Sequence, residues 1–411
     1  MAHILIAYKQ FPAPAVGHAG GEALFRLMEG LHGLGHRITL VARIADDERE
    51  HLSQVESICD NIYTIPHHRS LLGPRPLAFI RSYTLFRRAI QHTLKTKKPD
   101  FLHVETTQTA LAAVGLRRPS ASYRTQDVNW YLAEQRAAQL SGLNRAVALL
   151  ERAFFRRLEP WLARRYELML AISEGDRRLL AEAGAGERLM VVPLTPALPM
   201  SMDEALLSEV LPLKAQPPNL LFVGALSRNH NQDGIRWFLD AVWPSILDEV
   251  GEVQLCIVGG NPPEWLSARA DGNRVIVTGF VDDLAVWYHR ATVFISPLLI
   301  AGGLLQKVID AMALGVPVVA TSVCNHGVSA TPGIHLLTAD AAPEFAGAVV
   351  TLLRDPAARL RLGAAGQDFV RSAYNLESAV AAWGETIETL IAANHPPATL
   401  PTTHKATGGD I

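Results

Sequence analysis

Short apolar runs alternate along the chain with amphipathic stretches, and glycine, proline or polar residues separate them. In the first half, the run HILIAY at residues 3–8 is followed by a glycine-containing loop and by residues 22–34, where apolar side chains recur at helical spacing. In the second half, the run NLLFVG at residues 219–224 opens the same alternation. Continuous apolar runs are typical of parallel strands covered on both faces. The pattern therefore predicts an α/β protein with two doubly wound, Rossmann-like domains.

The boundary between the halves is marked by proline. Residues 199–218 are rich in proline around one short helical piece, a composition typical of an interdomain connection. We therefore expect an N-terminal domain at residues 1–198 and a C-terminal domain at residues 219–377. A last helical stretch follows at residues 378–394, and the Pro/Thr/Gly-rich residues 395–411 are expected to be disordered.

Composition and charge narrow the class of protein. The chain has 411 residues, of which 49% are hydrophobic and 19% charged, and its formal net charge is −2, which gives no sign of a nucleic-acid partner. Its three cysteines are far apart and have no metal-ligand spacing. The sequence opens directly on an apolar run, and no uninterrupted apolar run is long enough to cross a bilayer. We expect a soluble cytoplasmic protein.

The stretch SPLLIAGGLLQKVIDAMALGVPVVAT at residues 296–321 carries the most chemistry. It predicts a strand end, a glycine turn, a helix at 304–314 and a buried strand. A glycine turn that opens a helix favours anions, because its free N–H groups and the helix dipole attract negative charge. Gly303, Lys307 and Asp310 are spaced to share one helical face, which would place a cation and a carboxylate beside this phosphate cradle. The alternative is an ordinary crossover with a solvated lysine and aspartate.

This stretch resembles the donor-site signature of the retaining, GT-B-fold glycosyltransferases of family GT4. The run Asp310-Ala-Met-Ala-Leu-Gly-Val-Pro-Val-Val-Ala-Thr matches the second half of that signature, and Gly303 matches its glycine. Gly302 stands where the family has its first glutamate, and Asp310 replaces the second. In one subgroup a small residue at the first position accompanies a lysine three positions before the second acid, and Lys307 fits that pattern.

The resemblance implies a GT-B fold, in which two Rossmann-like domains face each other across a cleft and the last helix returns to the N-terminal domain. It implies a nucleotide-diphosphate sugar as co-substrate, with no cofactor and no metal. Lys307 and Asp310, together with Gln126, would form the catalytic group. The donor-binding positions that it implies are Gly224, Asn231, Gly260, Phe280, Val281, Gly302, Gly303, Leu304, Lys307 and Asp310.

Two further donor-site positions depart from the family. Many members have an arginine and a lysine that grip the diphosphate after the first strand of the C-terminal domain, where this chain has Ala225 and His230. Arg228 or His230 could supply the missing charge, and the sequence leaves both open. The pair Asp282-Asp283 invites a metal site, but we expect it to cap the helix that follows.

The N-terminal half offers candidates for the sugar or acceptor side. Residues 123–133 resemble a family segment in which a histidine lies against the donor sugar; here Gln126 stands at that position and Asp127 follows. Glutamine can hydrogen-bond a sugar hydroxyl but cannot titrate. Gly20 and Gly21 would let a ligand approach the first helix, or serve backbone geometry alone. Glu105 ends a predicted parallel strand and is expected to contact ligand.

Basic residues gather in the N-terminal half. In relatives with lipid-linked acceptors, such a face contacts anionic membranes, so the resemblance allows a peripheral contact at the inner membrane face. The alternative is a solvated helix face with Glu151 and Glu159 as partners. The basic residues are Arg81, Arg87, Arg88, Lys95, Lys97, Lys98, Arg145, Arg152, Arg156, Arg157, Arg164 and Arg165.

The function that the resemblance implies is retaining transfer of a sugar to an acceptor hydroxyl. The acceptor would be a glycan, a lipid-linked sugar or a small molecule, in polysaccharide, glycolipid or natural-product biosynthesis. The departures from the family at Gly302, Asp310, Ala225, Gln126 and Leu194 motivate an alternative, a catalytically silent GT-B protein that binds a nucleotide or sugar and supports an active partner. A nucleotide-sugar epimerase is disfavoured, because the acids expected for proton transfer at carbon are missing.

Overall fold

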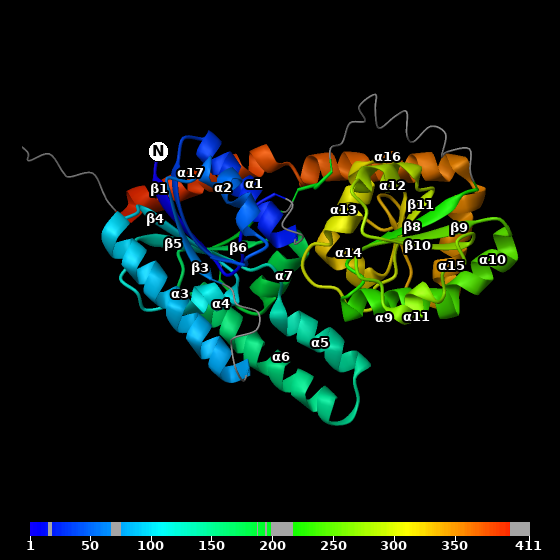
Figure 1. Cartoon of the computed structure of the whole chain (residues 1–411), viewed down its shortest axis with the longest axis horizontal. Coiled ribbons are helices and arrows are strands. Elements are labelled where there is room, and N and C mark those ends of the chain that lie inside the picture. Colours follow the sequence, from blue (N-terminus) through cyan, green and yellow to red (C-terminus); the bar gives the residue numbers. More distant parts are fainter. Residues whose placement is uncertain (15–18, 67–74, 187, 194, 199–216, 395–411) are drawn as a thin grey trace, which may run out of the picture.

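The computed structural model describes residues 1–14, 19–66, 75–186, 188–193, 195–198 and 217–394, which form two α/β domains side by side (Figure 1). Each domain has one parallel sheet with helices on both faces, so the predicted α/β class is confirmed. The expected tail at 395–411 and the expected connection at 199–218, except its last two residues, lie outside the described residues.

The N-terminal sheet has seven strands in the order β3-β2-β1-β4-β5-β6-β7. Its strands are β1 (His3–Tyr8), β2 (Arg37–Ile44), β3 (Asn61–Pro66), β4 (Phe101–Glu105), β5 (Ser120–Arg124), β6 (Leu168–Ala171) and β7 (Leu189–Val191). Its helices are α1 (Ala19–Gly33), α2 (Leu52–Glu56), α3 (Arg75–Lys97), α4 (Thr107–Ala113), α5 (Asn129–Gln139), α6 (Gly142–Ala163) and α7 (Glu174–Glu182), with a 3₁₀ turn at Arg49–His51.

The C-terminal sheet has six strands in the order β10-β9-β8-β11-β12-β13. Its strands are β8 (Asn219–Val223), β9 (Gln254–Val258), β10 (Val275–Gly279), β11 (Val293–Ser296), β12 (Val318–Ala320) and β13 (Leu337–Thr338). Its helices are α9 (Asn229–Trp237), α10 (Trp243–Val250), α11 (Glu264–Ser267), α12 (Leu284–Arg290), α13 (Gln306–Ala313), α14 (Ser322–Val328), α15 (Ala342–Arg354) and α16 (Pro356–Ala373), with a π turn at Phe238–Val242.

Both sheets reverse their strand order at one point, between β1 and β4 in the first domain and between β8 and β11 in the second. Loops leaving the two neighbouring strands run in opposite directions there, which opens a crevice at the carboxyl ends of the strands. The topology therefore favours ligand binding at the ends of β8 and β11 and at the ends of β1 and β4.

The last helix, α17 (Leu376–Asn394), packs on the N-terminal domain although it follows the C-terminal domain in sequence (Figure 1). Its Val380, Trp383 and Ile387 are buried in the same core as residues of α1 and β1. The Trp383 ring meets the His103 ring edge-on at 4.7 Å between centroids. Burying these side chains attaches α17 to the N-terminal domain, since each buried apolar side chain contributes about 1.5–3 kcal/mol.

Helices α5 and α6 form a hairpin that projects from the N-terminal domain (Figure 1). Glu159 joins them: its Oε1 accepts hydrogen bonds from the Asn129 amide at 2.9 Å and from Asn129 Nδ2 at 2.7 Å. Glu159 is fully buried, so it does not pair with surface arginines, whereas Glu151 pairs with Arg136 at 2.6 Å. Of the helices in the described parts of the chain, none combines the length and apolarity needed to span a membrane.

The helix after the glycine turn begins later than its sequence predicts. The expected start was residue 304, but α13 begins at Gln306, because Gly303 has a left-handed φ of 59° and Leu305 is extended. Gly303 is therefore outside the helix, and the expectation that it shares a helical face with Lys307 and Asp310 was wrong. The predicted cap is confirmed: the Asp283 side chain accepts from the Ala285 amide at 2.7 Å at the start of α12.

Candidate functional site

A cavity of about 470 Å³ lies between the domains, at the carboxyl ends of β8 and β11. Its C-terminal wall comes from the segments that follow these two strands. Its N-terminal wall comes from the start of α1 and from the segments after β5 and β6. The lining residues are Gly20, Gln126, Asp127, Leu132, Ile172, Val223, Gly224, Ala225, Arg228, His230, Asn231, Leu298, Ile300, Ala301, Gly302, Gly303, Leu304, Leu305, Gln306 and Lys307.

The ammonium group of Lys307 is positioned by a short chain of contacts. Its Nζ donates to Asn231 Oδ1 at 2.8 Å and lies 4.3 Å from the centre of the Phe222 ring. Asn231 Nδ2 donates to the Ala225 carbonyl at 2.9 Å, which fixes the amide orientation. Burial lowers the pKa of Lys307 to about 7; the nearby Cys324 opposes this shift and Arg228 adds to it. A bound anion would raise this pKa again, because it favours the charged form.

Free amides surround this cation. Helix α13 begins without a side-chain cap, and its first two residues, Gln306 and Lys307, line the cavity. Within the described part of the chain, the amides of Gly302, Gly303 and Leu304 have no hydrogen-bond acceptor. These amides and Lys307 are the groups that the sequence predicts as an anion cradle at this turn.

Arg228 is the second cation of the C-terminal wall. It is exposed, lines the cavity and precedes α9. His230 also lines the cavity, but burial, followed by the charges of Lys307 and Arg228, lowers its pKa to about 4. His230 is therefore neutral near pH 7, and of the two residues that the sequence leaves open, Arg228 is the one that carries charge.

The N-terminal wall presents Gln126 and Asp127. Gln126 Nε2 donates to Tyr8 Oη at 3.2 Å, and a methyl group on Gly20 would lie 2.8 Å from the same amide. Burial raises the pKa of Asp127 to about 6, while Lys9 and Arg228 partly offset the shift. A carboxylate with this pKa is ionised above pH 6 and can accept hydrogen bonds from hydroxyl groups.

The two walls meet at Gly303. A methyl group there would lie 2.5 Å from the Gln126 carbonyl oxygen and 3.0 Å from Asp127 Oδ1. This close approach and the φ of 59° both require glycine. Gly302 is less constrained, because a side chain there would meet only the side chain of Leu132 of α5. Leu132 would have to move to admit the glutamate that the family has at this position.

Asp310 does not lie where its sequence position predicts. It is 6% exposed and outside the cavity lining, and its Oδ1 accepts from the Ala197 amide at 2.7 Å and from Gln306 Nε2 at 2.9 Å. Burial raises its pKa to about 6, against the effect of these hydrogen bonds. Three residues along a helix turn the side chain by about 60°, so Asp310 faces Ala197 while Lys307 faces the cavity.

Glu105 is another correction. It is fully buried in the sheet and pairs with Arg124 at 2.6 Å and with His103 at 3.2 Å, so it does not reach the cavity as a ligand contact. Burial alone would raise its pKa, but the Arg124 guanidinium and the His103 hydrogen bond outweigh it and hold the pKa below its usual value. His103 and Glu105 lie on one face of β4, as alternate residues of a strand do.

Four other predicted positions are absent from the lining of the cavity. Gly21, Gly260, Phe280 and Val281 do not line it, and the Phe280 ring is 81% exposed. The sequence analysis did not identify two residues of α5, Leu132 and Gln135, that contact the loop at residues 298–305. Their spacing of three residues on one predicted helix is a weak signal, because many helices show it without contacting a second domain.

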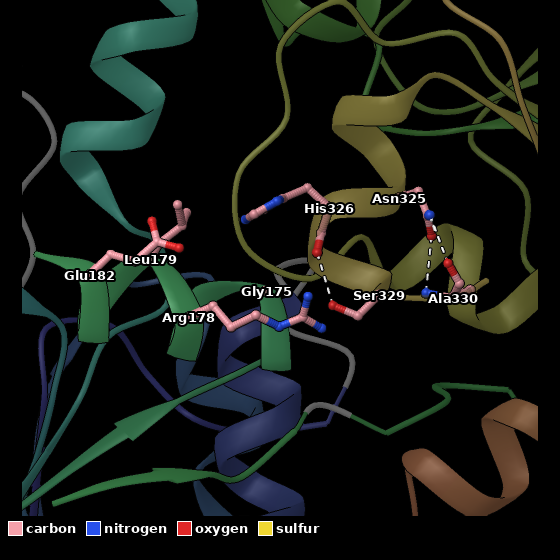
Figure 2. A pocket seen from close by; sticks show the side chains of 8 residues that line it. All are labelled: Gly175, Arg178, Leu179, Glu182, Asn325, His326, Ser329 and Ala330. Carbon is pink, nitrogen blue, oxygen red and sulfur yellow. Dashed lines mark hydrogen bonds between the residues drawn. The ribbon is translucent and has the colours of Figure 1, made fainter. Parts of the chain in front are cut away.

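A second interdomain pocket of about 340 Å³ lies between α7 and α14 (Figure 2). The side chains of Asn325 and Ser329 hydrogen-bond to backbone carbonyls of their own segment. The titratable residues that line the pocket are Arg178, Glu182 and His326. Burial and then Arg178 lower the pKa of His326. The His326 and Tyr131 rings lie 4.6 Å apart between centroids with their planes tilted by 37°, so this pocket is formed where α14 packs against the N-terminal domain.

Two family models match the chain. The model described as "Glycosyl transferase 4-like domain" matches residues 20–195, and the model described as "Glycosyl transferases group 1" matches residues 217–355. A curated relative, a phosphatidyl-myo-inositol mannosyltransferase of Mycobacterium leprae, is 29% identical over 226 residues, which are 52% of this chain and 57% of the relative.

Solved structures resemble the whole molecule. Sucrose-phosphate synthase from Thermosynechococcus elongatus superposes with a TM-score of 0.74 at 19% identity, over 95% of this chain and 100% of that one. HepE from Anabaena in complex with UDP superposes with a TM-score of 0.66 at 16% identity, over 94% of this chain and 100% of that one. At these identities the likeness shows the fold.

The fold and the interdomain cavity define the class: the molecule is a GT-B protein. The chain belongs to the group 1, GT4-like glycosyltransferases and is a transferase of class EC 2.4. The family and fold that its donor-site signature implies are thereby confirmed.

Proposed function

We propose that this enzyme is a retaining glycosyltransferase that uses a nucleotide-diphosphate sugar. The observation that carries the proposal is the cradle of the C-terminal wall, where Lys307 and uncapped amides face one cavity. Developing negative charge on a leaving diphosphate needs such donors, and fixed donors in a partly buried site stabilise a transition state more strongly than water does. The structural neighbour HepE is in complex with UDP, which supports a nucleotide as a ligand of this enzyme as well.

The proposed reaction divides the cavity between the two ends of the donor. Lys307, Arg228 and the amides of Gly302–Leu304 hold the diphosphate, while Gln126 and Asp127 face the sugar hydroxyls. The bond between the anomeric carbon and the diphosphate oxygen breaks as the acceptor oxygen bonds to that carbon on the same face. The acceptor proton passes to the leaving phosphate, so no protein base is required, and the cations make a metal unnecessary in this scheme.

The first test is a thermal-shift panel of UDP, GDP, ADP, dTDP and CMP on the unmodified protein and on Lys307→Ala. A nucleotide at 100 times its dissociation constant stabilises by about 2.7 kcal/mol, which raises the melting temperature measurably. We expect one nucleotide to shift the unmodified protein and to shift Lys307→Ala far less. A null panel would contradict the proposal and favour a protein without donor activity. Proton NMR of the product formed from the matching sugar nucleotide then reports whether configuration is retained.

One surface favours an acceptor at a membrane, with the enzyme peripheral at the cytoplasmic face. Helix α6 exposes Leu143 (80%), Leu150 (71%) and Phe154 (59%) on one side, and Arg157, three residues after Phe154, is exposed beside them. An apolar stripe with an adjacent arginine suits an anionic lipid surface, because the apolar side chains enter the headgroup boundary and the cation attracts lipid charge. The side chain of Arg81, from the predicted basic set, lies outside the described residues.

Vesicle sedimentation tests this contact. We expect the protein to pellet with vesicles that contain anionic lipid and to remain in solution with zwitterionic ones. The double variant Leu150→Ser, Phe154→Ser should lose this binding and keep its nucleotide affinity. Leu360→Ser is the matched control, since Leu360 is 75% exposed on the C-terminal domain, away from the hairpin. Equal pelleting of the double variant would remove the membrane from the proposal.

A further inference from the structure

The donor loop, residues 298–305 between β11 and α13, is held by a helix of the opposite domain. Leu132, Gln135 and Gln139 lie at i, i+3 and i+7 on α5, so they share one face. Leu132 packs on Gly302, Gln135 contacts Ala301, and Gln139 Nε2 donates to the Leu299 carbonyl at 2.7 Å. These three contacts, with Gly302, Ala301 and Leu299, cross the domain boundary.

The contact of Gln135 is two-sided. Its Nε2 donates to the Ala301 carbonyl at 2.8 Å, and its Oε1 accepts from the Ala301 amide at 2.9 Å. The side chain thus satisfies both backbone groups of one residue, as a neighbouring strand would. Gln135 is 9% exposed and Ala301 6%, so water cannot replace either bond without the domains separating. A buried backbone group left unpaired costs more than a typical hydrogen bond contributes.

The loop needs this support because of its own sequence. Gly302 and Gly303 impose little conformational preference, so the segment between Ala301 and Leu304 has many accessible conformations when it is free. The same segment carries the unpaired amides of the anion cradle. Ala301 is directly adjacent to these amides, and its backbone orientation fixes the direction in which the amide of Gly302 points.

We propose that α5 is the template that sets the donor loop, with Gln135 as the positioning residue that orients the cradle when the two domains are together. This inference rests on the proposed donor function. It makes binding of the nucleotide diphosphate and approach of the domains one coupled equilibrium, because the loop reaches its binding conformation only against α5. Gln135 touches no donor atom in this scheme and acts through Ala301.

Graded variants of Gln135 test the proposal. Gln135→Leu keeps the volume and removes both hydrogen bonds, whereas Gln135→Glu keeps the acceptor for the Ala301 amide and loses the donor to its carbonyl. Gln367→Leu is the matched control, because Gln367 Nε2 donates to the Ala313 carbonyl at 2.8 Å within the C-terminal domain alone. Hydrogen exchange of the peptide that covers residues 299–305, measured without nucleotide, reports directly how strongly α5 restrains the loop.

Gln135→Leu should speed exchange in this peptide about tenfold or more and weaken binding of UDP, or of whichever panel nucleotide binds, about tenfold, which corresponds to about 1.4 kcal/mol. KM for the sugar nucleotide should rise with little change in kcat, because the loop is realigned at the cost of binding free energy. Gln135→Glu should fall between, and Gln367→Leu should match the unmodified protein in all three measurements. Unchanged exchange elsewhere in the chain shows that the variants remain folded.

Four results would overturn the proposal. Exchange at 299–305 that is equal in Gln135→Leu and in the unmodified protein would show that α5 does not hold the loop. Faster exchange with unchanged nucleotide affinity would show that the held conformation is not the binding one. Faster exchange in a protein that binds none of the panel nucleotides would reject the donor function itself and leave Gln135 as a structural contact. A loss of melting temperature common to all Gln135 variants, with kcat and KM unchanged, would leave the donor function in place and show that Gln135 is a structural contact only.

Discussion

The two walls of the interdomain cavity differ in charge although they come from domains of the same strand order. The C-terminal wall presents Lys307, Arg228 and unpaired amides. The N-terminal wall presents Gln126 and Asp127, and Asp127 is the one carboxylate among the described residues that line the cavity. Cations and amides suit phosphate, whereas an amide and a carboxylate suit hydroxyl groups. The difference teaches that the topology supplies the location of a site, and the loop residues supply its chemistry.

The difference originates at the ends of the strands. In the N-terminal sheet, β4 and β5 end in His103, Glu105 and Arg124, which are fully buried and pair with one another. The Glu105–Arg124 pair lies inside the domain, and neither residue lines the cavity. In the C-terminal sheet, Gly224 follows β8 and β11 leads to the Gly302-Gly303 turn, so backbone amides reach the cavity instead. Substitutions in either wall should therefore separate phosphate binding from sugar handling.

The largest effect is expected where the walls touch. Gly303→Ala places a methyl group 2.5 Å from the Gln126 carbonyl, which forces the domains apart. We expect nucleotide affinity and transfer to fall about 100-fold, because overpacking against backbone has no flexible side chain to yield. Isothermal titration with the panel nucleotide and a transfer assay measure both.

Gly272→Ala is the matched control for this variant. Gly272 also has a left-handed φ, 71°, but has nothing within 4 Å of the position a methyl group would take. The variant Gly272→Ala should have a lower melting temperature, because the backbone strain is about 1 kcal/mol, and should keep its nucleotide affinity unchanged. Equal behaviour of the two variants would mean that strain alone, and not contact between the walls, sets the effect.

Asp127→Asn should break the N-terminal wall without disturbing the other. An ionised acceptor contributes about 1.5–3 kcal/mol to a hydrogen bond, so transfer should fall roughly 10–100-fold while nucleotide affinity is kept. Because the pKa of Asp127 is about 6, activity of the unmodified enzyme should be lost as the pH falls through 6, where the carboxyl becomes protonated. The variant should lack this acidic limb in a profile of kcat/KM against pH.

Asp310 provides the control for that limb. Its pKa is also raised to about 6, but it lies outside the cavity and bonds the Ala197 amide. Asp310→Asn retains an acceptor for that amide, so the acidic limb should persist in this variant. If the acidic limb disappeared in Asp310→Asn and persisted in Asp127→Asn, the titrating group would be Asp310, and our assignment of the limb to Asp127 would be wrong.

The sequence predicted more residues of the C-terminal wall than of the N-terminal one. The glycine turn, Lys307 and Asn231 were placed correctly at the cavity, because their spacing follows a local strand–turn–helix unit. Asp310 and Glu105 were misplaced. A position on a helix or at a strand end predicts a face, but the partner on that face is tertiary: the Ala197 amide for Asp310 and Arg124 for Glu105. Gln135 escaped prediction for the same reason, since Ala301 is 166 residues away in sequence.

The pH dependence of nucleotide affinity sharpens the description of the C-terminal wall. Lys307 has a pKa of about 7 without ligand, and a bound diphosphate raises it. The charged form binds the anion, so affinity is highest below pH 7 and falls as pH rises through 7, by about tenfold between pH 6 and 8. Titration in buffers of different ionisation enthalpy should show proton uptake on binding at pH 8.

The Lys307→Arg variant distinguishes titration of the lysine from titration of the nucleotide, whose own phosphate titrates in a similar pH range. Arginine remains charged throughout, so this variant reports the titration of the ligand alone. The decline in affinity above pH 7 should therefore be absent in it. A decline of equal size in Lys307→Arg would place the titrating group on the nucleotide and leave the lysine charged at every pH measured.

The smallest expected effect distinguishes two neighbours on the C-terminal wall. Arg228 is charged and exposed at the cavity, so Arg228→Ala should weaken nucleotide binding about three- to tenfold, less than a buried cation would, because solvent and salt screen it. Raising the salt concentration should shrink this difference. His230 is neutral near pH 7, since its pKa lies at about 4, and His230→Ala should change affinity less than twofold at pH 7. If His230→Ala lost more affinity than Arg228→Ala, the histidine would have to be charged in the complex. His230, two residues after Arg228, would then supply the second positive charge of this wall.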